Sequence, residues 1–228
     1  MKLRLLAATL AALTLTAGAA LAQDTSSAKG QLSYALGYQL GREAIESGEA
    51  LDVTTMTKAV QDGYAKKAPT VPVEQMRTAY QGMQKRLQAK AKAAFDKASA
   101  ENKTKSDAFL AQNRTKPGVK TLPSGVQYRV IETGNGAKPN QASNVELEVN
   151  GPFPWGQHPT PAQPAQKMAS MKLSQIEMAS MREVLLQMPA GSKWEIALPS
   201  DKAYGADPRT GFPPNVAVVF EVKLASVK

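Results

Sequence analysis

The sequence has no cysteine among its 228 residues. This absence excludes a disulfide framework, a thiolate nucleophile and any metal site built on cysteine. Histidine is nearly absent as well, because His158 is the sole example and lies in a proline-rich segment without clustered ligands. A zinc site or a Ser-His-Asp triad therefore has no support. We expect neither a metal nor a cofactor, and we expect His158 to be a solvated loop residue.

Long hydrophobic runs are also missing after the first residues. Residues 1–22 begin with the basic residues Lys2 and Arg4, continue with an apolar run from Leu5 to Thr16, and end in Ala-Leu-Ala. This order is typical of a cleaved signal peptide. The apolar run is too short to cross a hydrocarbon core of about 30 Å as a helix. We predict no transmembrane span and export to the periplasm, with the outer surface or secretion as alternatives.

Acidic residues are fewer than basic ones, at 19 against 28, which gives a formal charge of +9. Such a balance can indicate nucleic acid as a partner. Here a group of lysines spreads along one long helical segment, with Phe95 as the sole interleaved aromatic residue: Lys85, Lys90, Lys92, Lys97, Lys103 and Lys105. We therefore predict no nucleic-acid partner, and weak attraction to acidic polypeptides or membrane surfaces stays open.

Three helices are expected in the first half of the chain. Leucines recur every fourth residue between Leu32 and Leu40, and this helix should stop at Gly48. The second helix is predicted over Val53–Lys66, with Asp52 as its N-cap. The third is predicted from Val73 to about Gln112, and at 1.5 Å per residue its length is roughly 60 Å.

The third helix changes in character along its length. Its first part carries a short coiled-coil-like seam, with apolar residues at alternating spacings of four and three: Met76, Tyr80, Met83 and Leu87. Polar residues and alanine dominate from Gln88 onward, and such a helix either bridges domains through solvent or is not stable alone. We divide the chain into a helical module at 23–87, an exposed connector helix at 88–113 and a C-terminal domain at 114–228.

The C-terminal domain contains segments with the β-branched or alternating character of strands. They are Gln127–Glu132, Val145–Val149, Trp194–Leu198 and Val216–Leu224, and one helix is expected near Ser174–Gln187. The fold class is therefore α+β.

Two segments of this domain carry a resemblance to a known family. Both closely resemble FKBP-type peptidyl-prolyl cis-trans isomerases, and they are KWEIALPSDKAYGADPRTGFPPNVAVVFEV (193–222) and TLPSGVQYRVIETGNG (121–136). Two further segments are similar to the exported Mip and FkpA branch of this family, namely LSYALGYQLGRE and FLAQNRTKPGVKTLPSGVQY. The resemblance implies a bent antiparallel sheet of about five strands around a short helix. It also implies a homodimer formed through the N-terminal helices, and proline-containing unfolded or partly folded polypeptides as substrates.

The resemblance also implies which residues form the site. Tyr204 in Ala-Tyr-Gly matches the tyrosine that binds a ligand carbonyl, Phe220 matches the phenylalanine of the pocket floor, and Phe212 matches an apolar rim position. Tyr204 and Phe220 are therefore the candidate catalytic residues, and Phe212 is a candidate substrate-binding residue. The remaining candidates for substrate binding are Val149, Met171, Met178 and Met181.

Several positions depart from the family pattern. Val149 stands where the family has the aromatic residue of Tyr-Thr-Gly, and Met181 stands where it has a tryptophan. Pro159 and Thr160 occupy the positions of the usual Phe-Asp pair, so the pocket carboxylate is missing. Weak isomerase activity is therefore expected, and a catalytically impaired dimeric chaperone on the same scaffold is the alternative.

Other interpretations of these residues stay open. Tyr204 and Phe220 would also suit the core of any β-rich domain, and the methionines near Met178 keep a helical spacing that suits core packing. The proline-rich segment 152–164 is either a stiff surface connection or a loop folded over the altered site. In the second case Phe153 or Trp155 would replace the lost aromatic wall.

Overall fold

The computed structural model describes residues 24–228, so the predicted signal peptide at 1–22 lies outside the described residues. The chain divides into two compact units, and the boundary falls between Gln84 and Lys85. The connector that we expected at 88–113 therefore belongs to the C-terminal unit. Within residues 24–228, no helix combines the length and the apolar character that a membrane crossing requires.

Two of the three helices begin at capping side chains that the sequence supplies. Helix α1 (Ala28–Glu46) begins after Ser27, whose hydroxyl accepts the Gly30 N–H at 3.0 Å, and it ends two residues before the predicted stop. Helix α2 (Val53–Tyr64) has Asp52 as its N-cap, as predicted, with the carboxylate accepting the Thr55 N–H at 2.6 Å. Both caps satisfy N–H groups that lack a partner within the helix.

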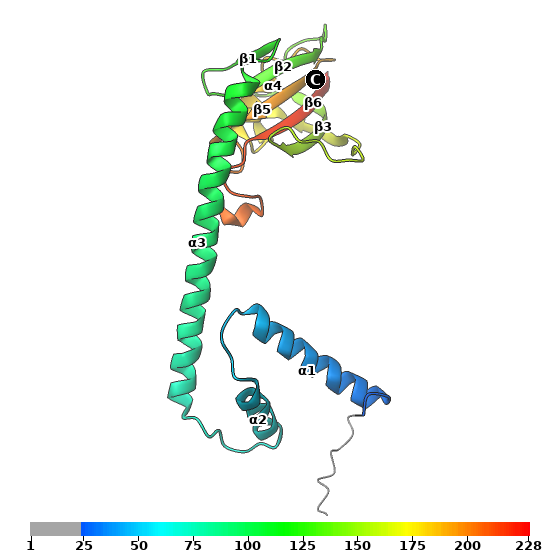
Figure 1. Ribbon diagram of the computed structural model, residues 1–228. Helices are drawn as coiled ribbons and strands as arrows, with labels where there is room; N and C mark the ends of the chain where they lie inside the picture. The colour runs from blue at the N-terminus through cyan, green and yellow to red at the C-terminus, as the bar shows by residue number, and fades with distance from the viewer. Residues whose placement is uncertain (1–23) are drawn as a thin grey trace, which may run out of the picture. The chain divides into compact units, whose positions relative to one another are not determined.

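Helix α3 runs from Val73 to Asn113 and confirms the predicted third helix within one residue at its end (Figure 1). Its residues from 88 to 94 are exposed, as the connector prediction required. The prediction of exposure is wrong for the last part of the helix, where Ser106 and Asn113 are buried against the C-terminal domain. The reason is that one face of α3 packs there against the sheet.

The C-terminal domain is built on one antiparallel sheet of six strands, one more than expected, in the order β1-β2-β5-β6-β3-β4. Its strands are β1 (Val119–Thr121), β2 (Gln127–Glu132), β3 (Asn144–Pro154), β4 (Gln166–Lys172), β5 (Lys193–Leu198) and β6 (Val218–Val227). Strand β4 at the sheet edge was not predicted, since its sequence QKMASMK contains no β-branched residue. The α+β fold class is confirmed.

The two faces of the sheet bury different sets of side chains. Ile196 of β5 and Phe220 of β6 belong to the large core, which also contains Val184 and Leu185 of helix α4 (Ala179–Leu185). On the alternate positions, Ala197 and Val219 form a second cluster with Phe153, packed against Phe109 and Leu110 of α3. The sheet is therefore covered by α4 on one face and by the end of α3 on the other.

The helix expected at Ser174–Gln187 is shorter than predicted. It consists of a single 3-10 turn, η1 (Leu173–Gln175), followed by the seven-residue helix α4. The extended backbone of Ile176 and Met178 separates the two pieces.

Candidate functional site

The loop between β5 and β6 carries two of the predicted site residues. It starts with the 3-10 turn η2 (Ser200–Lys202), whose last carbonyl accepts the Ser180 hydroxyl of α4 at 2.6 Å. It continues through Tyr204 and a second 3-10 turn, η3 (Pro208–Thr210). Two short turns thus fold the loop back on itself and bring Phe212 beside Tyr204.

The aromatic rings of Tyr204 and Phe212 stack, with centroids 4.4 Å apart and an interplanar angle of 25°. Both side chains are partly buried and pack against the large core. Burial raises the pKa of the Tyr204 phenol above its ordinary value, because the charged form is poorly solvated there. Among the described residues no protein group forms a hydrogen bond with its hydroxyl, so that group is available to a ligand.

Phe220 and Met181 form the buried layer of the candidate site. Phe220 is 6% exposed on β6, and Met181 is 7% exposed on α4. The Phe220 ring lies close to the backbone at Gly151, since a Cβ built there would stand 3.1 Å from a ring carbon. Gly151 ends the segment Val149-Asn150-Gly151, which stands where the family pattern has Tyr-Thr-Gly.

Val149 and Met178 pack against the same core, each half-buried. Six of the seven predicted residues therefore meet around one apolar cluster. Met171 is the exception: it lies on β4 opposite Val145, and it belongs neither to the core nor to the residues packed against it.

The hypothesis that Phe153 covers the site is wrong. Strand β3 contains one extra residue between Asn150, which pairs with Glu221, and Phe153, which pairs with Val219. Such a bulge reverses which face of the sheet the following side chains point to. Phe153 therefore joins the second cluster, on the face that packs against α3 and away from Phe220.

Trp155 is also held by α3. Its indole N–H donates to the Ser106 hydroxyl at 3.0 Å, and the ammonium of Lys105 lies 4.5 Å from the ring centroid. The ring packs in part against the large core as well. The proline-rich segment 152–164 thus contains an anchored tryptophan. Its His158 lies in a loop and is exposed, as predicted. The imidazole contacts the Phe153 ring, with centroids 4.1 Å apart and planes tilted by 38°, and its Nε2 lies 4.0 Å from a Glu221 carboxylate oxygen.

Sequence reasoning missed Asn215, which lies between the site loop and α3. Its side chain donates to the Ser99 hydroxyl at 2.7 Å, and its carbonyl accepts the Ser106 hydroxyl at 2.8 Å. An asparagine after Pro-Pro is a recognisable turn signal. The serines of α3 carry no comparable signal, because serine in a polar helix is expected to face water.

The chemistry available at the site is apolar contact and one hydroxyl. Asp207 lies in the same loop, but its carboxylate caps η3 and pairs with Arg209, with a shortest distance of 2.6 Å. Within residues 24–228, no three histidine, aspartate or glutamate side chains gather as a metal site would require. The arrangement suits an uncharged ligand group that loses its hydration and packs against the aromatic rings.

Comparisons with known proteins show the family of this chain. Residues 136–225 match the family described as FKBP-type peptidyl-prolyl cis-trans isomerase. Residues 29–130 match the domain described as amino terminal to that isomerase. The two matches together cover nearly all of the described chain.

Individual relatives span most of the chain. The outer membrane protein MIP of Legionella longbeachae is 38% identical over 233 residues, covering 100% of this chain and 99% of that protein. The FKBP-type isomerase FkpA of Aeromonas hydrophila is 32% identical and covers 90% of this chain and 78% of that protein. The crystal structure of FkpA from Escherichia coli superposes with a TM-score of 0.65 at 26% identity, covering 89% of this chain and 98% of that one.

Proposed function

Because this chain belongs to the FKBP-type peptidyl-prolyl cis-trans isomerases of the Mip and FkpA type, we propose that it isomerises X-Pro bonds in unfolded or partly folded exported polypeptides. The observation that carries the assignment of the site is the stack of Tyr204 on Phe212 beside the core that contains Phe220. A proline ring is a compact, apolar group that suits such a surface.

The proposed mechanism needs no bond to break. Rotation about a prolyl amide must overcome a barrier of about 18–20 kcal/mol, because resonance favours the planar form. The planar amide is more dipolar than the twisted one, so removing water from it favours the twisted transition state. Phe220 and Met181 supply apolar contact in this proposal, and the Tyr204 hydroxyl donates a hydrogen bond to the substrate carbonyl.

Weak activity is part of the proposal. Val149 and Met181 supply aliphatic or thioether surface where the family has aromatic rings, and Pro159 and Thr160 offer no carboxylate. Phe153 cannot compensate, because it lies on the other face of the sheet. Met178 completes the apolar wall, and Met171 is retained as a peripheral contact for longer substrates.

Homodimerisation through the N-terminal helices is supported by the apolar surface of the first unit. Among its described residues, helix α1 buries none, although it carries Leu36, which is 62% exposed. Tyr64 of α2 is 92% exposed, and Tyr80 of α3 is also exposed. Soluble proteins rarely leave so many large apolar side chains in water, so a second copy of the chain is the proposed cover.

A dimeric chaperone or client-binding module is the second candidate function. Two apolar sites in one dimer can retain an unfolded polypeptide by avidity, even where each site binds weakly. Export is supported by the signal-peptide pattern at 1–22 and by the relative described as an outer membrane protein. The periplasm is the proposed compartment.

The test is a stopped-flow assay of cis-to-trans conversion in a proline tetrapeptide. We expect the wild-type protein to exceed the spontaneous rate, which is slow because unassisted isomerisation takes tens of seconds. Tyr204→Phe should lower kcat/KM about fivefold through the loss of one hydrogen bond, and Phe220→Ala should lower it further. Met168→Leu, at an exposed position of β4 outside the predicted site, serves as the matched apolar control and should retain activity.

Wild-type and variant rates that all equal the spontaneous value would remove the isomerase proposal. Suppression of client aggregation by the same inactive protein would then support the chaperone.

A further inference from the structure

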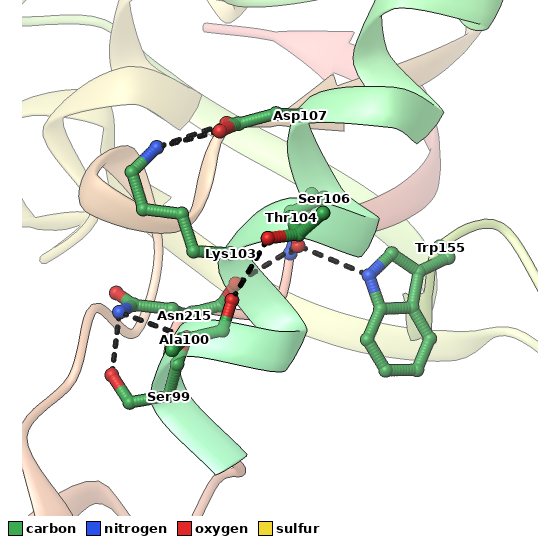
Figure 2. Close-up of polar contacts among 9 residues, drawn as sticks. Ser99, Ala100, Lys103, Thr104, Ser106, Asp107, Trp155 and Asn215 are labelled. Carbon is green, nitrogen blue, oxygen red and sulfur yellow. Dashed lines mark hydrogen bonds and ion pairs between the residues drawn. The ribbon is translucent and has the colours of Figure 1, made fainter. Parts of the chain in front are cut away.

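Asn215 occupies a backbone conformation that few residues adopt. Its φ of +55° lies in the left-handed region, where asparagine is tolerated better than most residues other than glycine. The conformation directs its side-chain amide to Ser99 and its carbonyl to Ser106, both on α3, as Figure 2 shows. The amide also donates to the Ser99 carbonyl at 3.4 Å, so one residue of the loop makes three hydrogen bonds with the helix.

The same residue is bonded to the predicted site. Its backbone N–H donates to the carbonyl of Gly205 at 2.8 Å, and Gly205 directly follows Tyr204. Three residues before Asn215, Phe212 stacks on the Tyr204 ring. Asn215 thus lies between α3 on one side and the Tyr204–Phe212 stack on the other.

Helix α3 holds this part of the loop at further points. Asn102 donates to the carbonyl of Pro214 at 2.9 Å, and the backbone N–H of Ala217 donates to the Ser106 hydroxyl at 2.7 Å. Ser106 is 2% exposed, and its hydroxyl uses its full hydrogen-bonding capacity, since it donates to Asn215 and accepts from Ala217 and Trp155. A buried hydroxyl with every partner satisfied is a rigid contact.

We propose that Asn215 is a positioning residue, through which the Ser99–Ser106 segment of α3 fixes the Tyr204–Phe212 stack. The proposal rests on the isomerase function proposed above, because the stack is the site of that reaction. In this proposal α3 does more than connect two parts of the chain, because it also fixes the position of the aromatic rings in the isomerase site. Asn215 itself need not touch the substrate.

The test uses the full chain and four variants. Asn215→Gly keeps the left-handed backbone accessible and removes only the side-chain bonds to Ser99. Ser99→Ala removes the hydroxyl that accepts the shorter of these bonds and keeps the Ser99 carbonyl, whereas Ser99→Thr retains a hydroxyl. Thr104→Ala is the control on the same helix, because the Thr104 hydroxyl bonds only to the Ala100 carbonyl of its own helix (Figure 2).

We expect Asn215→Gly and Ser99→Ala to lower kcat/KM for the tetrapeptide about fivefold, the effect of one hydrogen bond. Ser99→Thr should recover most of the wild-type rate, and Thr104→Ala should not change it. A purely structural role would instead lower the urea midpoint with activity per folded molecule intact. Equal kcat/KM in wild type, Asn215→Gly and Ser99→Ala would overturn the proposal.

Hydrogen exchange separates this proposal from the proposed function. If the wild-type protein is inactive, the function fails and the positioning role is judged by the amide of Asn215, which bonds to Gly205. Faster exchange of that amide in Ser99→Ala than in Thr104→Ala supports the positioning role. Equal protection in the two variants would overturn it.

Discussion

At the scale of single residues, Gly151 shows how little space surrounds the candidate site. Its φ is +121°, a conformation that L residues rarely adopt, and an added Cβ would stand 2.8 Å from the Val219 carbonyl oxygen. The same Cβ would press on the Phe220 ring. A glycine is required here for both reasons.

We predict that Gly151→Ala destabilises the protein by about 1–3 kcal/mol, the usual cost of such backbone strain, and lowers isomerase activity by displacing Phe220. Urea unfolding and the tetrapeptide assay measure the two effects. Gly118→Ala is the matched control, because Gly118 has a φ of +77° but its nearest neighbour would be 3.8 Å away. Equal losses of activity in both variants would contradict the role of the Phe220 contact.

Asp207 provides a pH-dependent test in the site loop. Hydrogen bonds from Arg209 lower the pKa of Asp207 from 3.8 to about 2. Because the pKa is lower in the folded state, the contribution of this carboxylate to stability is fully present above pH 3.8 and is lost as the pH falls through about 2. The η3 turn should therefore persist in mild acid.

We predict that an NMR titration of the Asp207 carboxyl carbon gives a pKa near 2. Arg209→Ala should raise this pKa toward 3.8, since the side-chain hydrogen bond of Arg209 is the largest cause of the shift. An unchanged pKa in the variant would show that the ion pair is not formed in solution.

At the scale of elements, the end of α3 packs against the C-terminal domain through a face that consists mostly of polar residues. Ser99, Asn102, Ser106, Phe109 and Asn113 recur at alternating spacings of three and four, which is the repeat of a helix face. Only one of these five is apolar, so hydrophobic periodicity could not find the face. The helix itself was predictable within one residue, but its burial was not.

We predict that a fragment 88–228 is more stable than a fragment 114–228 by about 2–4 kcal/mol, through apolar burial and hydrogen bonds to α3. The shorter fragment loses Phe109 and Leu110, which cover Phe153 and Val219. Urea denaturation measures the difference. A fragment 95–228 is the control and should match 88–228, because residues 88–94 are exposed. Equal stability of the first two fragments would contradict the packing role of α3.

At the scale of the whole molecule, the exposed apolar face of α1 determines the expected assembly. We predict that the wild-type chain sediments as a dimer and that Leu36→Lys shifts it to a monomer, since a charge cannot enter an apolar interface without cost. Gln88→Lys, in the exposed stretch 88–94 of α3, is the control for an added charge and should remain dimeric.

The monomeric variant should also separate the two candidate functions. Its rate on a tetrapeptide should be unchanged per site, because each site lies within one chain. Its suppression of client aggregation should fall, because avidity is lost. A monomeric wild-type protein would contradict the proposed assembly.

The sequence by itself determined the family, the α+β class and the length of α3, because caps, helical spacing and short motifs act over neighbouring residues. Its motifs also predict Tyr204, Phe212 and Phe220 as site residues. Tertiary structure decided the rest. The bulge in β3 sent Phe153 to the opposite face of the sheet, and the fold brought Asn215 to Ser99 across 116 positions of the chain. Contacts between such distant residues depend on how the sheet and α3 pack, and no local pattern records that packing.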